Sequence, residues 1–320
     1  MTNKYKPEGL LIDTVQNKTL QKNMGVLKDT MMKGKILEGR AIVCDTEHNL
    51  IVELGCCKGI ISRFETAMGI DDGTVRDVAI ISRVNKPVSF VVTGFKTVDG
   101  VGEMAILSRR KVQEQCYREY ISQLNAGDII DAKITHMESF GCFVDVGCGI
   151  TALMPIDAIS ISRIAHPSDR FRIGQNIKAV VKSVDEIGRL ILTHKELLGT
   201  WEENALCFSP GETVAGIIRS VESYGIFVEL SPNLAGLAEL KSGVLPGQHA
   251  GVYIKSIIPE KMKIKLIVVD SFDAAYMPPD PQYYIKDTHI SFWKYSPECS
   301  YKTVESIFSD RYSQIYGKAT

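Results

Sequence analysis

A series of short strand-like segments is written three times along the chain. In the middle copy, residues 138–147 read ESFGCFVDVG, and residues 222–230 repeat the pattern as ESYGIFVEL. Residues 48–55, HNLIVELG, align with the same segment when Gly55 is placed on Gly147. Such repetition indicates that one structural unit is used several times, so we expect three small domains, each with its own core.

The sequence pattern of each copy predicts five short β-strands. In the middle copy they are GDIIDAKITHM (127–137), SFGCFVDVG (139–147), GITALMP (149–155), NIKAVVKSVD (176–185) and RLILTH (189–194). The third copy contains TVAGIIRSV (213–221), YGIFVEL (224–230), LAGLAEL (234–240), GVYIKSII (251–258) and KIKLIVV (263–269). The first contains KILEGRAIVC (35–44), LIVELG (50–55), GIISR (59–63), PVSFVVTGF (87–95) and MAILSRR (104–110). Five β-branched-rich strands separated by turn signals, such as those at 98–103 and 186–188, are typical of a small barrel.

Between the copies the composition changes to that of helices. Residues 108–124 and 194–208 hold many helix formers and no proline, although Gly199 interrupts the second segment with a poor helix former. A short helix is also expected at 303–308. The predicted domains are an N-terminal arm (1–30), a first barrel (31–110), a linking helix (111–125), a second barrel (126–196), a linking helix (197–208), a third barrel (209–270) and a proline-rich, aromatic C-terminal extension (271–320).

Overall charge limits the kinds of partner. The 320 residues carry a net charge of −1, so no general basic field attracts nucleic acid or membrane. The first residues lack the apolar core of a signal peptide, and no apolar run is long enough to span a membrane. Eight cysteines without a CxxC pair read as reduced, buried thiols. We therefore expect a cytoplasmic protein without a membrane partner.

Catalytic patterns are missing from the sequence. No nucleophile motif, metal-ligand cluster or paired carboxylates at a recognisable spacing occur, so we predict neither an enzyme nor a bound cofactor or metal.

The aromatic residues of the repeated segment raise a question of side-chain direction. Strict alternation would put Phe140 and Phe143 on opposite faces of one strand. Gly141 between them suggests a β-bulge, which would bring both rings to one face. An aromatic residue in a strand is more often part of the core. The recurrence of aromatic–Gly–x–aromatic–Val at Tyr224 and Phe227 favours instead a surface of exposed rings, on which bases of single-stranded nucleic acid can stack.

The middle copy resembles the RNA-binding domain of bacterial ribosomal protein S1. The resemblance rests on GDIIDAKIT, FGCFVDVG, HPSDRFRIGQ and VDEIGRLILTHKE. The third copy shares it through YGIFVEL, NLAGLAEL and KIKL, and the first through PVSFVVTGF and ILSRR. Over about residues 33–270, the resemblance implies a mainly β chain of three tandem OB-fold barrels of the S1 type, joined by helical linkers.

For the second barrel, the resemblance implies an RNA face made by Phe140 and Phe143, with Asp185 at the turn before the last strand and Arg189 at its start. The family often has a histidine at the end of the third strand, where this chain has Pro155.

Two residues of the HPSDR loop are expected to compensate for that missing histidine. His166 and Arg170 lie near the RNA face in the family's fold. The alternative for His166 is an ordinary solvated or capping role.

For the third barrel, the resemblance implies an RNA face of Tyr224, Phe227 and Lys263. Lys261 and Lys265 flank Lys263, and alternation predicts one exposed face for the three lysines.

Several positions depart from the family's pattern. In the third barrel Pro259 replaces the turn aspartate and Glu239 the histidine, and a carboxylate there repels phosphate. In the first barrel His48 and Ile51 occupy the aromatic positions and Met104 the basic one. We therefore expect the first barrel to bind RNA poorly. The resemblance implies that it serves as an anchor, as the first domains of ribosomal protein S1 do.

The C-terminal extension is rich in rings. They either form another stacking platform or pack on the third barrel, and we favour packing. These residues are Tyr283, Tyr284, Phe292, Trp293 and Tyr295.

The sequence and the resemblance together predict a non-catalytic protein that binds single-stranded RNA, chiefly through the second barrel. The resemblance implies capture of mRNA during translation initiation on the small (30S) ribosomal subunit. The alternatives are an RNA-binding regulator of mRNA stability or transcription away from the ribosome, and a scaffold whose barrels bind proteins. A nuclease would need a catalytic domain, which the sequence does not reveal.

Overall fold

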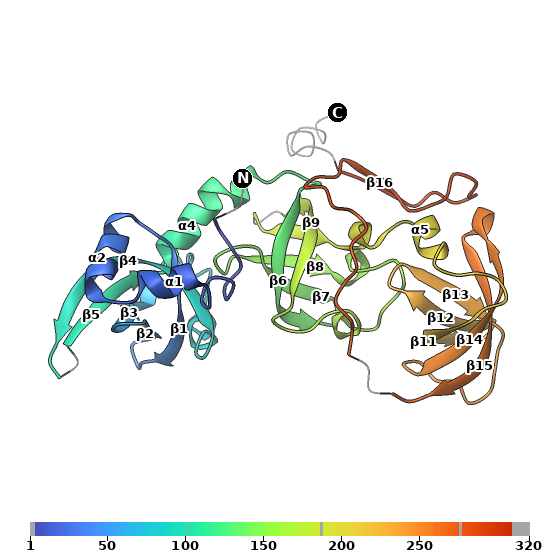
Figure 1. Ribbon diagram of the computed structural model, residues 1–320, viewed down its shortest axis with the longest axis horizontal. Coiled ribbons are helices and arrows are strands. Elements are labelled where there is room, and N and C mark those ends of the chain that lie inside the picture. The colour runs from blue at the N-terminus through green and yellow to red at the C-terminus, as the bar shows by residue number, and fades with distance from the viewer. Residues whose placement is uncertain (1–3, 101, 186–187, 275–276, 309–320) are drawn as a thin grey trace. The chain divides into compact units, whose positions relative to one another are not determined.

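The computed structural model describes residues 4–100, 102–185, 188–274 and 277–308 and contains three closed five-stranded barrels (Figure 1). The first barrel comprises β1 Leu37–Cys44, β2 Leu50–Glu53, β3 Lys58–Ile61, β4 Pro87–Val98 and β5 Gly102–Ser108. The second comprises β6 Ile129–Glu138, β7 Gly141–Asp145, β8 Thr151–Pro155, β9 Asn176–Val184 and β10 Leu190–Thr193. The third comprises β11 Thr213–Glu222, β12 Gly225–Ser231, β13 Leu234–Ala238, β14 His249–Ile258 and β15 Lys263–Phe272.

All three barrels have the same strand order, first–second–third–fifth–fourth. The third and fifth strands pair in parallel and close the barrel. The fourth strand of each barrel contains a β-bulge, at Thr93, Lys182 and Lys255 respectively. The mainly β fold of three barrels is thus confirmed, whereas the predicted domain boundaries stay a prediction.

The barrels belong to two compact units. The described residues up to Leu124, together with Asp145–Thr151, form one unit, and Asn125–Val144 with the residues from Ala152 onward form the other. Among the residues described, no helix is long and apolar enough to cross a membrane. The turns expected at 98–103 and 186–188 include residues 101, 186 and 187, which lie outside the described residues.

In the first unit the N-terminal arm is folded onto the barrel. It contains α1 Val15–Leu20 and α2 Met24–Met32, whose N-terminal N–H groups are capped by Thr14 and Asn23. Leu27 of α2 is buried in the core of the first barrel. The remaining helices of this unit are α3 Val78–Ile81 and α4 Arg110–Glu119.

The two linking helices differ from each other. The segment 108–124 forms α4 and a 3₁₀ turn at Ile121–Gln123. The prediction of one continuous helix over 194–208 is wrong, because a 3₁₀ turn at Lys195–Leu198 ends at Gly199 and α5 Trp201–Ala205 follows. Gly199 has φ 84°, which glycine adopts without strain, and Thr200 then caps α5.

Residues 277–308, here called the C-terminal strap, run along the second and third barrels within the second unit (Figure 1). Trp293 and Tyr295 are buried in the core of the third barrel, which confirms packing there. Tyr283 packs instead against His194 of the second barrel, with ring centroids 5.6 Å apart. The helix expected at 303–308 is wrong: β17 Glu305–Ile307 pairs with β16 Phe292–Lys294.

Candidate nucleic-acid interface

Two rings of the second barrel lie together on its surface. Phe140 is 54% exposed, and its ring meets that of Phe143 edge to face, with centroids 6.1 Å apart. The third barrel repeats this geometry with Tyr224, 67% exposed, and Phe227, again with centroids 6.1 Å apart. The expectation that each pair shares one face is met, and we call each of them a ring pair.

The reason for the shared face differs from the prediction of a bulge at the glycine. Glu222 pairs with Gly225, so Tyr224 lies in the two-residue turn before β12 and is not bound by strand alternation. Phe140 lies in the equivalent turn before β7. In the β11–β12 hairpin the bulge is at Arg219, in the strand before the turn.

The glycine of each motif is needed for close approach of the backbone. A Cβ atom on Gly141 would lie 2.4 Å from the carbonyl oxygen of Met154. On Gly225 it would lie 2.7 Å from the carbonyl oxygen of Ala238. Any side chain would therefore push the third strand away from the second.

A third ring, which sequence reasoning missed, extends the ring pair of the second barrel. The exposed imidazole of His136 stacks on Phe143 with centroids 6.2 Å apart and an interplanar angle of 22°. Its Nε2 lies 2.6 Å from Oε1 of Glu138. In the third barrel the equivalent residue is Ser220, which pairs with Phe227. Alignment of the first strand of the second barrel with that of the third would have placed His136 opposite Phe143.

Strand register relates the basic positions of the three barrels. The parallel pairs that close them are Ile60–Ile106, Leu153–Ile191 and Leu237–Lys265. The residues two positions before Ile106, Ile191 and Lys265 are Met104, Arg189 and Lys263, so these three positions are equivalent. Met104 is buried and Ile51 takes the place of the second ring, so the first barrel has no comparable face.

Asp185 and Arg189 meet at the β9–β10 hairpin. The guanidinium Nε of Arg189 lies 3.1 Å from Oδ2 of Asp185, and the backbone N–H of Arg189 donates to Oδ1 at 2.7 Å. About one third of the Arg189 side chain is exposed. The aspartate therefore orients the arginine while leaving part of the cation open to a phosphate.

The lysines of the third barrel are divided by secondary structure. Lys263 and Lys265 alternate with buried residues along β15 and are exposed on one face. Lys261 belongs to the 3₁₀ turn Pro259–Lys261, so the expectation that alternation places all three lysines together is wrong. Glu239 lies 3.7 Å from Nζ of Lys255, which offsets part of its charge.

His166 is used by its own loop. Its Nδ1 accepts a hydrogen bond from the backbone N–H of Ser168, and Asp169 completes a capping box around the 3₁₀ turn Pro167–Asp169. The capping alternative for His166 is thus the one that the structure contains.

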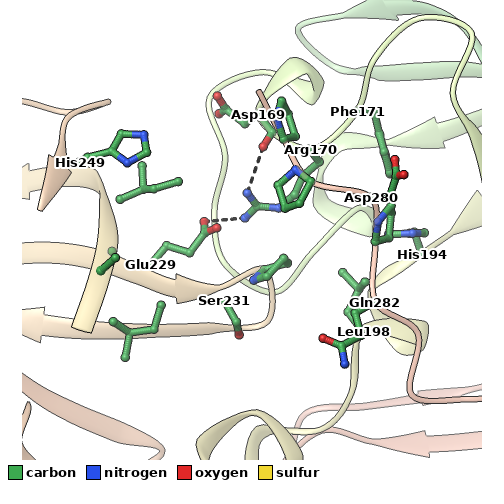
Figure 2. Close-up of a pocket in the computed structure, with 18 residues that line it drawn as sticks. Asp169, Arg170, Phe171, His194, Leu198, Glu229, Ser231, His249, Asp280 and Gln282 are labelled. Carbon is green, nitrogen blue, oxygen red and sulfur yellow. Dashed lines mark hydrogen bonds and ion pairs between the residues drawn. The ribbon is translucent and has the colours of Figure 1, made fainter. Parts of the chain in front are cut away.

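Arg170 is not on the ring face. Its guanidinium is buried and donates to Glu229 of the third barrel at 2.5 Å (Figure 2). Arg219 donates to the same carboxylate at 2.7 Å. Its Nε also donates to the hydroxyl of Ser160 at 3.2 Å. The expected RNA contact of Arg170 is inconsistent with this burial, because the loop turns the side chain toward the neighbouring barrel.

The Arg170–Glu229 pair borders a cavity of about 410 Å³ within the second unit, which the strap residues 278–282 also line (Figure 2). His194 lies in its wall, fully buried, and burial lowers the pKa of its imidazole to about 4. The neutral ring stays within 3.1 Å of the carbonyl oxygen of Ile159 and 3.3 Å of the hydroxyl of Tyr283.

Comparison with known proteins agrees with this geometry. Residues 123–195 match the family model of the S1 RNA binding domain. Over 171 residues the chain is 33% identical to a small ribosomal subunit protein bS1 homolog of Bacillus subtilis, covering 52% of this chain and 44% of that protein. Over 180 residues it is 28% identical to bS1 of Staphylococcus aureus, covering 54% and 45%. The chain thus spans less than half the length of these relatives.

Among solved structures, the chain is similar to a multidomain protein with nucleic acid binding domains from Streptococcus pneumoniae, at 13% identity over 76% of each chain. The TM-score of 0.25 is too low to support any conclusion. The family match and the ring pair fall in the same barrel. The chain therefore carries an S1 RNA-binding domain at residues 123–195 and is a distant relative of the bS1 proteins.

Proposed function

We propose that this protein binds single-stranded mRNA without catalysis, chiefly through the second barrel and with help from the third. The observation that carries the proposal is the ring pair, present with the same geometry in both barrels. Exposed rings at this spacing suit stacking of successive bases, and each stack contributes about 1–3 kcal/mol. Every base has a π-face, so little sequence preference is expected.

Phosphates are held by a small number of cations. Arg189 supplies one beside the ring pair of the second barrel, and Lys263 and Lys265 supply two in the third. Few neutralised phosphates give a shallow dependence of affinity on salt. Linking two moderate sites in one chain raises the overall affinity through effective concentration, which suits capture of unstructured mRNA.

The first barrel takes a different role in this proposal. Ile51 and Met104 replace the ring and the cation, so the barrel serves as an anchor to protein or ribosome. The distant relation to bS1 supports a place on the small (30S) ribosomal subunit in translation initiation. A regulator of mRNA stability or transcription would use the same face away from the ribosome.

Fluorescence anisotropy with a labelled uridine-rich oligonucleotide, titrated from low to moderate salt, tests the binding. The proposal predicts saturable binding at low salt with a shallow salt slope. Absence of binding at low salt would contradict it and leave a protein scaffold as the explanation of the barrels. Cosedimentation of the cytoplasmic protein with 30S particles separates the ribosomal role from that of a free regulator.

A further inference from the structure

One position of the fourth strand differs among the three barrels. Counted from the closing parallel pairs, Val91, Val180 and Tyr253 are equivalent. Val91 and Val180 are buried, and Val180 packs beneath Leu197 and Ile290. Tyr253 is 37% exposed on the outside of the third barrel. A surface that is covered in two barrels is open in the third.

The facing position of the fifth strand differs in the same way. Ser108 and Thr193 are buried hydroxyl residues, and Thr193 donates to the carbonyl oxygen of Ala158 at 3.1 Å. In both barrels a helical segment follows at once. The third barrel has Ile267, 40% exposed and directly opposite Tyr253, and β15 continues as a strand to Phe272. Where the other two barrels have a helical segment after the fifth strand, the third barrel has a longer fifth strand.

Charged side chains border this open surface. Lys255 projects from the bulge of β14 and is exposed. Lys265 lies two residues before Ile267 on β15, so its side chain is on the same face. The nearby carboxylate Glu239 lies 3.7 Å from Nζ of Lys255. A second carboxylate, Asp270, faces Gly251 two residues before Tyr253 and accepts a hydrogen bond from its backbone N–H. The two lysines therefore stand at one end of the surface and Asp270 at the other.

Strand pairing connects the open surface to the ring pair. Phe227 pairs with Leu237, Leu237 with Lys265, and β14 lies next to β15. Tyr253, opposite Ile267, is therefore three strands from Phe227 and displaced by two residues along β15. At the usual spacings this is about 14 Å across the strands and about 7 Å along them. OB-fold barrels bind about 4–16 nucleotides of single-stranded nucleic acid, so one strand of RNA can reach both places.

We propose that Tyr253, with Ile267 opposite it on β15 and Lys255 and Lys265 on the same face, forms an additional base-stacking position for single-stranded RNA on the third barrel. This inference rests on the proposed RNA-binding function. It makes the third barrel the one with the longer RNA path, since the second barrel buries Val180 at the same place. An exposed ring beside Lys255 and Lys265 favours RNA over an apolar protein partner.

The test uses the full chain and two substitutions of one residue. Tyr253→Val installs the residue that the second barrel has there, and Tyr253→Phe keeps the ring as a matched control. Each is titrated with uridine oligonucleotides of 4 and 16 nucleotides by fluorescence anisotropy. The proposal predicts that Tyr253→Val loses roughly 5- to 150-fold in affinity for the longer RNA, the effect of one lost stack, with less effect on the shorter one. Tyr253→Phe should bind like wild type.

Photocrosslinking of 5-iodouridine RNA, followed by mass spectrometry, identifies the rings in contact. Crosslinks at both Tyr224 and Tyr253 are expected. If wild type binds RNA and crosslinks at Tyr224, while Tyr253→Val changes neither affinity nor crosslinks, the additional position is refuted and the proposed function stands. Loss of self-association in Tyr253→Val with unchanged RNA affinity would identify a protein-docking surface instead. Absence of RNA binding by wild type would overturn both proposals.

Discussion

The guanidinium of Arg170 donates to the carboxylate of Glu229 at 2.5 Å, and both side chains are only 5% exposed. Arg170 belongs to the loop before β9 and Glu229 to β12, so the ion pair joins the second barrel to the third within one compact unit. Arg219 shares the carboxylate at 2.7 Å. Glu229 thus neutralises two cations in a place with little water.

Replacement of Glu229 by glutamine should strongly destabilise the second unit. Arg170 would lose its carboxylate partner, and Arg219 would be left with Asp169, 3.3 Å away. Breaking a buried pair in this way costs about 3–5 kcal/mol. The matched control is Asp280→Asn, which removes an exposed partner of Arg172 at 2.7 Å and should cost less than about 1 kcal/mol. The free energy of unfolding in urea measures both. Equal, small effects of the two variants would contradict a structural role for the Arg170–Glu229 pair.

His194 makes stability of the second unit depend on pH. Its folded-state pKa, about 4, lies below the value of 6.5 for an exposed histidine, because burial disfavours the charged ring. The stabilisation is therefore fully present above pH 6.5 and is lost as pH falls from 6.5 toward 4. Complete loss amounts to about 3 kcal/mol. Docking of the C-terminal strap should weaken with it, because Tyr283 lies against the ring.

Urea unfolding at pH 7 and at pH 4.5 measures this dependence. His194→Gln should lose the part of the pH dependence that lies between these values, whereas His136→Gln, on an exposed ring, should keep it. An unchanged pH profile in His194→Gln would show that other groups cause the acid sensitivity.

Lys263 and Lys265 should contribute to the salt dependence of RNA binding. Each phosphate contact on a single strand adds about 0.7 to the slope of log affinity against log salt, so Lys263→Ala/Lys265→Ala should flatten the slope by about 1.4. Lys35→Ala, at an exposed position of the first unit, is the control and should leave the slope unchanged. Identical slopes for the double variant and wild type would remove these lysines from the RNA face.

The repeated pattern made the barrels predictable, because alternating β-branched residues and turn signals are local properties of the sequence. The ring pairs were predictable through their repetition. Their mechanism was not, because the turn at Tyr224 contains neither glycine nor proline at its two central positions and reads as strand. Gly199 is a poor helix former, which the sequence shows. That the helical segment ends at Gly199 follows from its positive φ, which the sequence does not show.

Contacts between distant segments were beyond sequence reasoning. Arg170 sits in a loop whose side chain turns toward the third barrel, and no local pattern encodes that direction. Tyr253 and Val180 occupy equivalent positions with opposite exposure, because exposure depends on the segment that follows the fifth strand. Burial of Trp293 and Tyr295 was predictable in kind, since aromatic residues in an extension usually pack.

The most direct measurement is anisotropy binding of a short uridine-rich RNA to wild type and to Phe140→Ala/Phe143→Ala, with circular dichroism to show that the variant is folded. Phe140 is largely exposed, so its loss should spare the core. The loss of two stacks predicts a decrease of about 2 kcal/mol or more in binding free energy. A folded variant that binds RNA as tightly as wild type would contradict the assignment of the second barrel's ring pair as the RNA face.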